Sequence, residues 1–153
     1  MGFSATVRCQ LCRELTAPAE QGQKVEVQKE DYSGIFEGSV SVQNGIVHVR
    51  YEGPDGMRCA VSFAKTDPDI ITLNQKYGED TDTLTLVIEE GRRHISINRT
   101  HGEQLEITSL GFRVRNSIQK NGKLLLSYAT ELHGFRVEKT HLCLEMHKIN
   151  NIK

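Results

Sequence analysis

Features that mark membrane, secreted and helical proteins are missing from this sequence. Apolar runs last only a few residues, whereas a helix that spans a membrane needs about 20 apolar residues. The opening segment MGFSATVR has no basic stretch leading into an apolar one, so we expect no secretory signal. No window repeats apolar residues at the three- and four-residue spacing of an amphipathic helix. We therefore expect a cytoplasmic protein without a membrane partner, built mainly from strands.

Motifs of catalysis and cofactor binding are missing as well. No serine lies in a nucleophile elbow, no glycine-rich phosphate loop follows a strand, and no dinucleotide fingerprint is present. The acidic segment with Glu79, Asp80 and Asp82 lacks the twelve-residue pattern of a calcium loop, and we interpret it as a solvated turn. The sequence therefore predicts no cofactor and no catalytic residues, and it favours a protein that is not an enzyme.

Alternation of apolar and polar residues dominates what is present. Short runs rich in Val, Ile, Leu and Thr change side at every residue, as half-buried strands do. Turn sequences separate the runs about every ten residues, and VQNGIV at 42–47 is the clearest, because Asn-Gly tolerates the positive φ of a tight hairpin. The expected strands cover 25–28, 38–43, 46–52, 59–63, 84–89, 94–98, 105–107, 112–115, 124–132 and 141–146.

The number of strands predicts the fold class. We expect residues 1–153 to form a single all-β domain, since this length suits one hydrophobic core. A sheet of about eight to ten sequential antiparallel strands must curl or close, because an exposed edge invites aggregation. An up-and-down β-barrel meets this demand, with an interior that is either filled by side chains or hollow.

The order of these segments resembles a known family. GRRHISINRTHGEQLEI, followed by FRVRNSIQKNGKLLLSYATELHG and a last EKTHLCLEM strand, is similar to the YwiB-like family of small bacterial proteins, as is FEGSVSVQNGIVHVRYEG. The resemblance runs from Val25 to Met146 and rests on strand pattern, turn positions and a few Gly, Tyr and Thr residues. It implies a calycin barrel of the lipocalin superfamily, and it implies no particular activity.

The cysteines include a pair with the spacing of zinc and redox centres. Cys9 and Cys12 lie three residues apart, but on a strand they would point to opposite faces. No second ligand pair has the downstream spacing of a zinc site, and no helix begins at Cys9 to activate its thiol. We interpret Cys9 as part of the barrel wall and Cys12 as a rim residue, and we expect both, with Cys59 and Cys143, to be reduced.

The last strand, THLCLEMHK, places four potential metal ligands on one face. They alternate with Leu and Met and are His141, Cys143, Glu145 and His147. Residues two apart on a strand are separated by about 6.8 Å, so two long side chains could meet at one ion. Any half-buried strand shows this pattern when its leucine face looks inward. We therefore predict no metal site and keep a metal-binding protein as a further alternative.

Several aromatic residues continue the apolar faces of predicted strands. If these faces line the barrel, the phenols of Tyr51 and Tyr128 lie in an apolar interior and each needs a hydrogen-bond partner, water or a ligand. The pattern also fits a filled barrel in which the hydroxyls reach the mouth. Our leading hypothesis is non-enzymatic binding of a small, largely apolar ligand. The residues expected to bind it are Tyr51, Phe63, Phe112 and Tyr128, with Arg113 or Arg115 at the rim for an anionic group.

Residues 91–123 form a basic segment in an otherwise acidic chain. They hold 7 Lys and Arg against 2 Asp and Glu, whereas residues 1–90 hold 8 against 15. The simplest interpretation is that neighbouring strands pair these cations with carboxylates from the first ninety residues. The alternative is a macromolecular adaptor that binds RNA or an acidic protein, which we rank second because aromatic and basic residues do not interleave. We thus expect a small apolar ligand as partner rather than nucleic acid, and leave a homodimer open.

Overall fold

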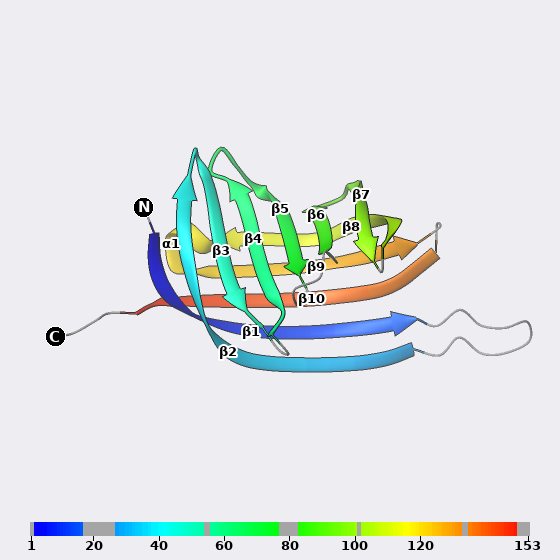
Figure 1. The fold of residues 1–153 in the computed structure, drawn as a ribbon, viewed down its shortest axis with the longest axis horizontal. Coiled ribbons are helices and arrows are strands. Elements are labelled where there is room, and N and C mark those ends of the chain that lie inside the picture. The colour runs from blue at the N-terminus through cyan, green and yellow to red at the C-terminus, as the bar shows by residue number, and fades with distance from the viewer. Residues whose placement is uncertain are drawn as a thin grey trace, which may run out of the picture.

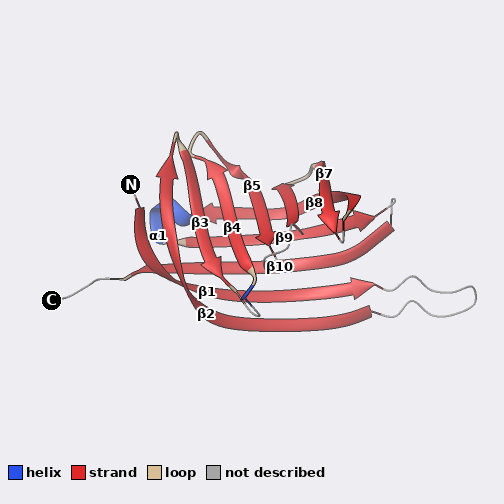
Figure 2. Ribbon diagram, in the orientation of Figure 1, coloured by secondary structure: helices blue, strands red, loops and turns tan. Residues whose placement is uncertain are grey.

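The residues that the structure describes form ten strands and one short helix, and the strands close into a barrel (Figures 1 and 2). The computed structural model describes residues 2–16, 27–53, 56–76, 83–100, 102–132 and 135–149. The elements in these ranges are β1 (Gly2–Thr16), β2 (Val27–Gln43), β3 (Ile46–Glu52), β4 (Arg58–Ala64), β5 (Asp67–Lys76), β6 (Thr83–Glu89), β7 (Arg93–Thr100), β8 (Glu103–Ser117), α1 (Ile118–Asn121), β9 (Lys123–Leu132) and β10 (Phe135–Lys148).

The order of the strands in the sheet follows the order in the sequence. Each strand pairs antiparallel with the next one along the chain, and β1 closes the ring by pairing with β10. A closed sheet exposes no strand edge to another chain. The predicted all-β, antiparallel up-and-down barrel is therefore confirmed.

The alternating apolar and polar residues of the sequence face the inside and the outside of the barrel wall, respectively. On β3, Val47, Val49 and Tyr51 are buried, and the residues between them are half-buried or exposed. Tyr51 lies directly opposite Cys59 of β4, and Val47 lies opposite Phe63, so inward side chains of neighbouring strands share a layer. Burial of each large apolar side chain contributes about 1.5–3 kcal/mol to stability.

The predicted Asn-Gly hairpin is confirmed between β2 and β3. Asn44 has φ 52° and Gly45 has φ 77°, the left-handed conformation that a two-residue hairpin requires. The carbonyl oxygen of Gly45 also accepts a hydrogen bond of 2.9 Å from the backbone N–H of Lys65, which joins this turn to the one after β4.

The short helix α1 lies at one end of the barrel (Figure 1), and apolar side chains are packed in that half. Ile118 of α1 is buried, and the helix stops at Gly122, which has φ 74° and donates a 3.0 Å hydrogen bond to the Ile118 carbonyl. Ile71, Leu124 and Leu126 lie in the same half and are almost completely buried. In the part of the chain that the structure describes, no helix has the length and apolar character needed to cross a membrane.

The wall is least regular between β6 and β7. Among the described residues, these strands pair in register only at Thr83 and Arg99. The side chain of Asn98 fills part of the gap, because its Oδ1 accepts a 2.5 Å hydrogen bond from the backbone N–H of Thr85. β7 also reverses the usual polarity, since Asn98 is buried while Ile95 and Ile97 are 66% and 71% exposed on the outside.

Candidate ligand-binding cavity

The half of the barrel away from α1 encloses a cavity of about 790 Å³. Its wall is mostly apolar, and the side chains that form it include Leu11, Phe36, Leu84, Leu86, Leu105 and Ile107. Polar side chains from several strands interrupt this wall. The most deeply placed of them form two groups, one around Tyr51 and one around Tyr128.

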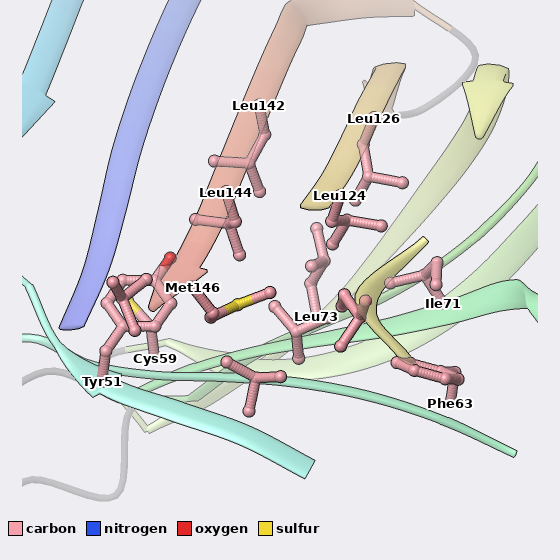
Figure 3. Packing of buried hydrophobic residues seen from close by; sticks show 14 of the residues in the cluster. Tyr51, Cys59, Phe63, Ile71, Leu73, Leu124, Leu126, Leu142, Leu144 and Met146 are labelled. Carbon is pink, nitrogen blue, oxygen red and sulfur yellow. The ribbon is translucent and has the colours of Figure 1, made fainter. Parts of the chain in front are cut away.

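The first polar group joins the phenol of Tyr51 to two thiols. Cys59 lies directly opposite Tyr51 on β4, Cys9 comes from β1, and both thiols are in hydrogen-bond contact with the Tyr51 hydroxyl. Figure 3 shows Tyr51 and Cys59 side by side at one edge of the buried cluster. Burial raises the pKa of Tyr51 and of Cys9, and it raises the pKa of Cys59 to about 11. These groups are therefore protonated at neutral pH and act as neutral hydrogen-bonding groups rather than nucleophiles.

An aromatic stack extends from Tyr51 along the wall. The ring of Phe36 lies 6.0 Å from that of Tyr51 and 6.1 Å from that of Tyr32, both in stacked orientation. Gly34 makes room for this stack, because a Cβ at that position would lie 2.8 Å from both Phe36 Cζ and Tyr32 Oη. The absence of a side chain at Gly34 therefore lets two aromatic rings lie against the inner surface of β2.

The second polar group contains an ion pair within the cavity. Arg13 Nε lies 3.3 Å from Glu138 Oε1, and the two side chains are 28% and 27% exposed. The same oxygen of Glu138 accepts a 3.1 Å hydrogen bond from the Thr140 hydroxyl, which is in turn hydrogen-bonded to Tyr128. Burial and then the nearby Glu138 carboxylate raise the pKa of Tyr128, so its hydroxyl stays neutral. Arg13, Glu138, Thr140 and Tyr128 thus form one connected chain of contacts.

Two of the predicted site residues line this cavity, whereas Phe63, Phe112, Arg113 and Arg115 do not. Tyr51 and Tyr128 face it, as their strand patterns predict. Phe63 is buried but belongs to the packed half, and Figure 3 shows it beside Ile71 at the edge of the cluster opposite Tyr51. Arg113 is exposed on the outside of β8. The structure thus separates residues that the sequence pattern had grouped.

The prediction that Phe112 faces inward is wrong. Phe112 is 38% exposed, and Lys139 Nζ lies 5.7 Å from the centre of its ring on the outer surface. The cause is a β-bulge, because the register of β8 against β9 shifts between Gly111 and Arg113. A bulge adds one residue to a strand and reverses the alternation beyond it. Phe112 and Val114 therefore lie on opposite faces although they are two residues apart.

The polar residues Arg13 and Glu138 were missed by sequence reasoning, although a signal for them exists. Val7 and Cys9 are buried on β1, and the alternation continues through Leu11 to Arg13. Extending the inward face of β10 backward from Leu142 reaches Thr140 and Glu138 in the same way. Strict period-two counting to the end of each strand would have placed these charges inside.

The remaining cysteines and the proposed metal ligands lie on the outside. Cys9 and Cys12 point to opposite faces as predicted, and a hydrogen bond with Asp31 raises the pKa of Cys12. His147 Nε2 lies 3.0 Å from Glu145 Oε1 on the outer face of β10. Within the described ranges, no three His, Cys, Asp or Glu side chains are grouped to hold a metal ion. The acidic segment 79–82 lies outside the described residues.

Part of the basic segment is neutralised by neighbouring strands. Arg92 pairs with Glu89 at 3.5 Å, and Arg115 pairs with Glu90 at 3.5 Å on the outside of the barrel. Arg93 pairs at 2.9 Å with Glu131, which comes from β9 rather than from the first ninety residues. The pairs of Arg92 and Arg115 follow the simplest interpretation of the basic segment, whereas the pair of Arg93 with Glu131 differs from it.

Comparison with known proteins identifies a structural relative. No protein-family model matches the chain, and no curated protein matches it. The crystal structure of YwiB protein from Bacillus subtilis aligns with 96% of this chain and 94% of that chain, at a TM-score of 0.57 and 13% identity. The chain shares the fold of YwiB. The resemblance predicted from the sequence is thereby confirmed for the fold, and an identity of 13% carries no further inference.

Proposed function

We propose that this barrel is a non-enzymatic binding protein for a small, largely apolar ligand held in the cavity. The observation that carries the proposal is the cavity itself, whose volume of about 790 Å³ falls within the range of about 300–1,000 Å³ typical of small-molecule sites. Its mostly apolar wall favours transfer of an apolar ligand from water, and Tyr51 and Tyr128 supply a few polar contacts that orient it.

The chemistry of the cavity supports binding rather than covalent reaction. The thiols of Cys9 and Cys59 are held protonated by burial, whereas a nucleophilic cysteine needs a lowered pKa. We further propose that the protein belongs with the calycin barrels of the lipocalin superfamily. Its four free cysteines support a place in the cytoplasm, where thiols remain reduced.

A fluorescent apolar probe tests the proposal. N-phenyl-1-naphthylamine is uncharged, and its emission rises when it leaves water, so we expect saturable enhancement with the wild-type protein. Ile107→Trp places an indole in the cavity and should weaken probe binding about tenfold, or about 1.4 kcal/mol, because the indole takes space that the probe would occupy.

Thr108→Trp is the matched control for Ile107→Trp. Thr108 is the next residue of β8 and lies opposite Ile95, whose side chain is on the outside. We expect this variant to bind the probe as the wild-type protein does. Absence of saturable binding to the wild-type protein, or equal loss in both variants, would contradict the proposal.

A further inference from the structure

Among the described residues that line the cavity, Arg13 is the one with a positive charge. Arg13 lies on β1, between Cys9 and the end of the strand at Thr16. Only 28% of its side chain is exposed. A charge withdrawn from water to this extent is costly unless it is paired and hydrogen-bonded, so its surroundings indicate what it binds.

Glu138 holds Arg13 without using all of its donors. The contact runs through Nε, and a guanidinium carries four further N–H groups on its two terminal nitrogens. Glu138 is itself held in place by Thr140, which donates to the same Oε1. This arrangement fixes the direction of the guanidinium before a ligand arrives, which reduces the entropy lost on binding.

The groups around Arg13 are hydrogen-bond donors in their neutral form. Burial raises the pKa values of Cys9, Cys59 and Tyr128, and the positive charge of Arg13 lowers all three to a smaller extent. Arg13 is therefore close enough to act electrostatically on both polar groups of the cavity. Neutral thiols and hydroxyls beside a guanidinium do not repel an anion, because they carry no negative charge.

Glu30 is the second carboxylate of the cavity, and its position leaves it little effect on an anionic ligand at Arg13. Glu30 lies opposite Arg13 on β2 and lines the same cavity, but its side chain is exposed. Water screens the charge of an exposed carboxylate, so its repulsion of an anionic group is weak.

We propose that the ligand is a single-tailed amphiphile with a carboxylate head, which Arg13 binds through its terminal nitrogens. A planar carboxylate matches the guanidinium fork and can accept two parallel hydrogen bonds. The tail lies against the apolar wall at Leu84, Leu86 and Ile107. This inference rests on the proposed function and names the chemical class of its ligand.

Displacement of N-phenyl-1-naphthylamine by three twelve-carbon amphiphiles tests the inference. Dodecanoic acid, dodecan-1-ol and dodecylamine share a tail and differ in the head. The wild-type protein should bind dodecanoate at least about tenfold more tightly than dodecanol, the effect of charge-assisted hydrogen bonds. Dodecylamine should bind more weakly than either.

Arg13→Met retains apolar volume and removes the charge. It should lose the preference for dodecanoate while keeping its affinity for dodecanol and the probe. Arg13→Lys keeps the charge but lacks the bidentate fork, so it should retain part of the preference. Thermal unfolding of each variant shows whether it is folded, and Arg13→Lys carries the test if Arg13→Met is not.

The outcomes separate this inference from the proposed function. Equal binding of acid and alcohol by the wild-type protein, a preference for the amine, or a preference that survives in both Arg13 variants overturns the carboxylate assignment. Each of those results leaves binding of an apolar ligand intact. Failure of the probe and of all three amphiphiles to bind overturns both proposals.

Discussion

The two halves of the barrel are built from the same strands and differ in what those strands place inside. Beside α1, β9 carries Leu124 and Leu126 inward, and both are at most 2% exposed. Farther along the same strand, Tyr128 and Thr130 face the cavity. On β5, Ile71 in the packed half gives way to Gln75 at the cavity. On β9 and β5, one end of the strand thus belongs to the core and the other end lines the cavity.

This difference shows what period-two patterning determines and what it leaves free. Alternation decides which side chains face inward, whereas their size and polarity decide whether a layer is filled. About eight strands enclose a space that side chains just fill, and the diameter grows with strand number. Ten strands enclose a larger interior. Branched apolar side chains fill one half of it, and the polar groups of the other half line a cavity.

Truncation of leucine in each half gives the largest expected contrast. Leu126→Ala should destabilise the fold by about 2–5 kcal/mol, because Leu126 is fully buried in the packed half and its loss creates a new void. Leu84→Ala should cost about 1 kcal/mol, since Leu84 already borders the cavity. Urea unfolding monitored by circular dichroism measures both values. Equal costs would show that the two halves are packed alike.

Raising the pH should lower the stability of the fold through Cys59, which lies in the half of the barrel that holds the cavity. Burial raises the pKa of Cys59 to about 11, so the folded state holds this proton more tightly than the unfolded chain does. The stability that the protonated thiol contributes is therefore fully present below pH 9.0, the ordinary value, and is lost as the pH rises toward 11. Between pH 8 and 11 the wild-type protein should lose up to about 2 kcal/mol more than Cys59→Ser does.

Urea unfolding of both proteins across this pH range measures the difference. Burial raises the pKa of Tyr51, and Cys59 raises it further, so the comparison measures Cys59 together with its effect on Tyr51. Parallel stability curves for the two proteins would contradict the assignment of a buried, protonated thiol.

A substitution outside both halves should have the smallest effect. Ile97→Thr changes an isoleucine whose side chain is 71% exposed on β7, and we expect a change in stability within about 0.5 kcal/mol. Threonine keeps the β-branched shape that suits a strand. A loss of more than 1.5 kcal/mol in urea unfolding, roughly three times the expected limit, would mean that Ile97 is packed rather than exposed.

Most of the fold could be predicted from the sequence because its determinants are local. Val47, Val49 and Tyr51 face inward as their alternation predicts, and Asn44–Gly45 turns where its dihedral preference predicts. The displacement of Phe112 could not be predicted in this way. A bulge depends on the register between two strands, and the residues of β8 alone do not specify it.

The candidate site was only partly predictable for a similar reason. The inward positions of Tyr51 and Tyr128 follow from their own strands. The pairing of Arg13 with Glu138 joins β1 to β10, at opposite ends of the sequence, and needs the ring to be closed. The cavity is lined by residues from strands at both ends of the sequence, so its volume has no local signature.

The sparse pairing of β6 with β7 has a mechanical consequence for the whole cylinder. The circumference of a closed barrel is held by the backbone hydrogen bonds between each pair of neighbouring strands. Between β6 and β7, the side-chain oxygen of Asn98 accepts a hydrogen bond from the backbone N–H of Thr85 in place of a backbone carbonyl. We therefore expect the barrel to widen first between β6 and β7 when it takes up a ligand larger than the cavity.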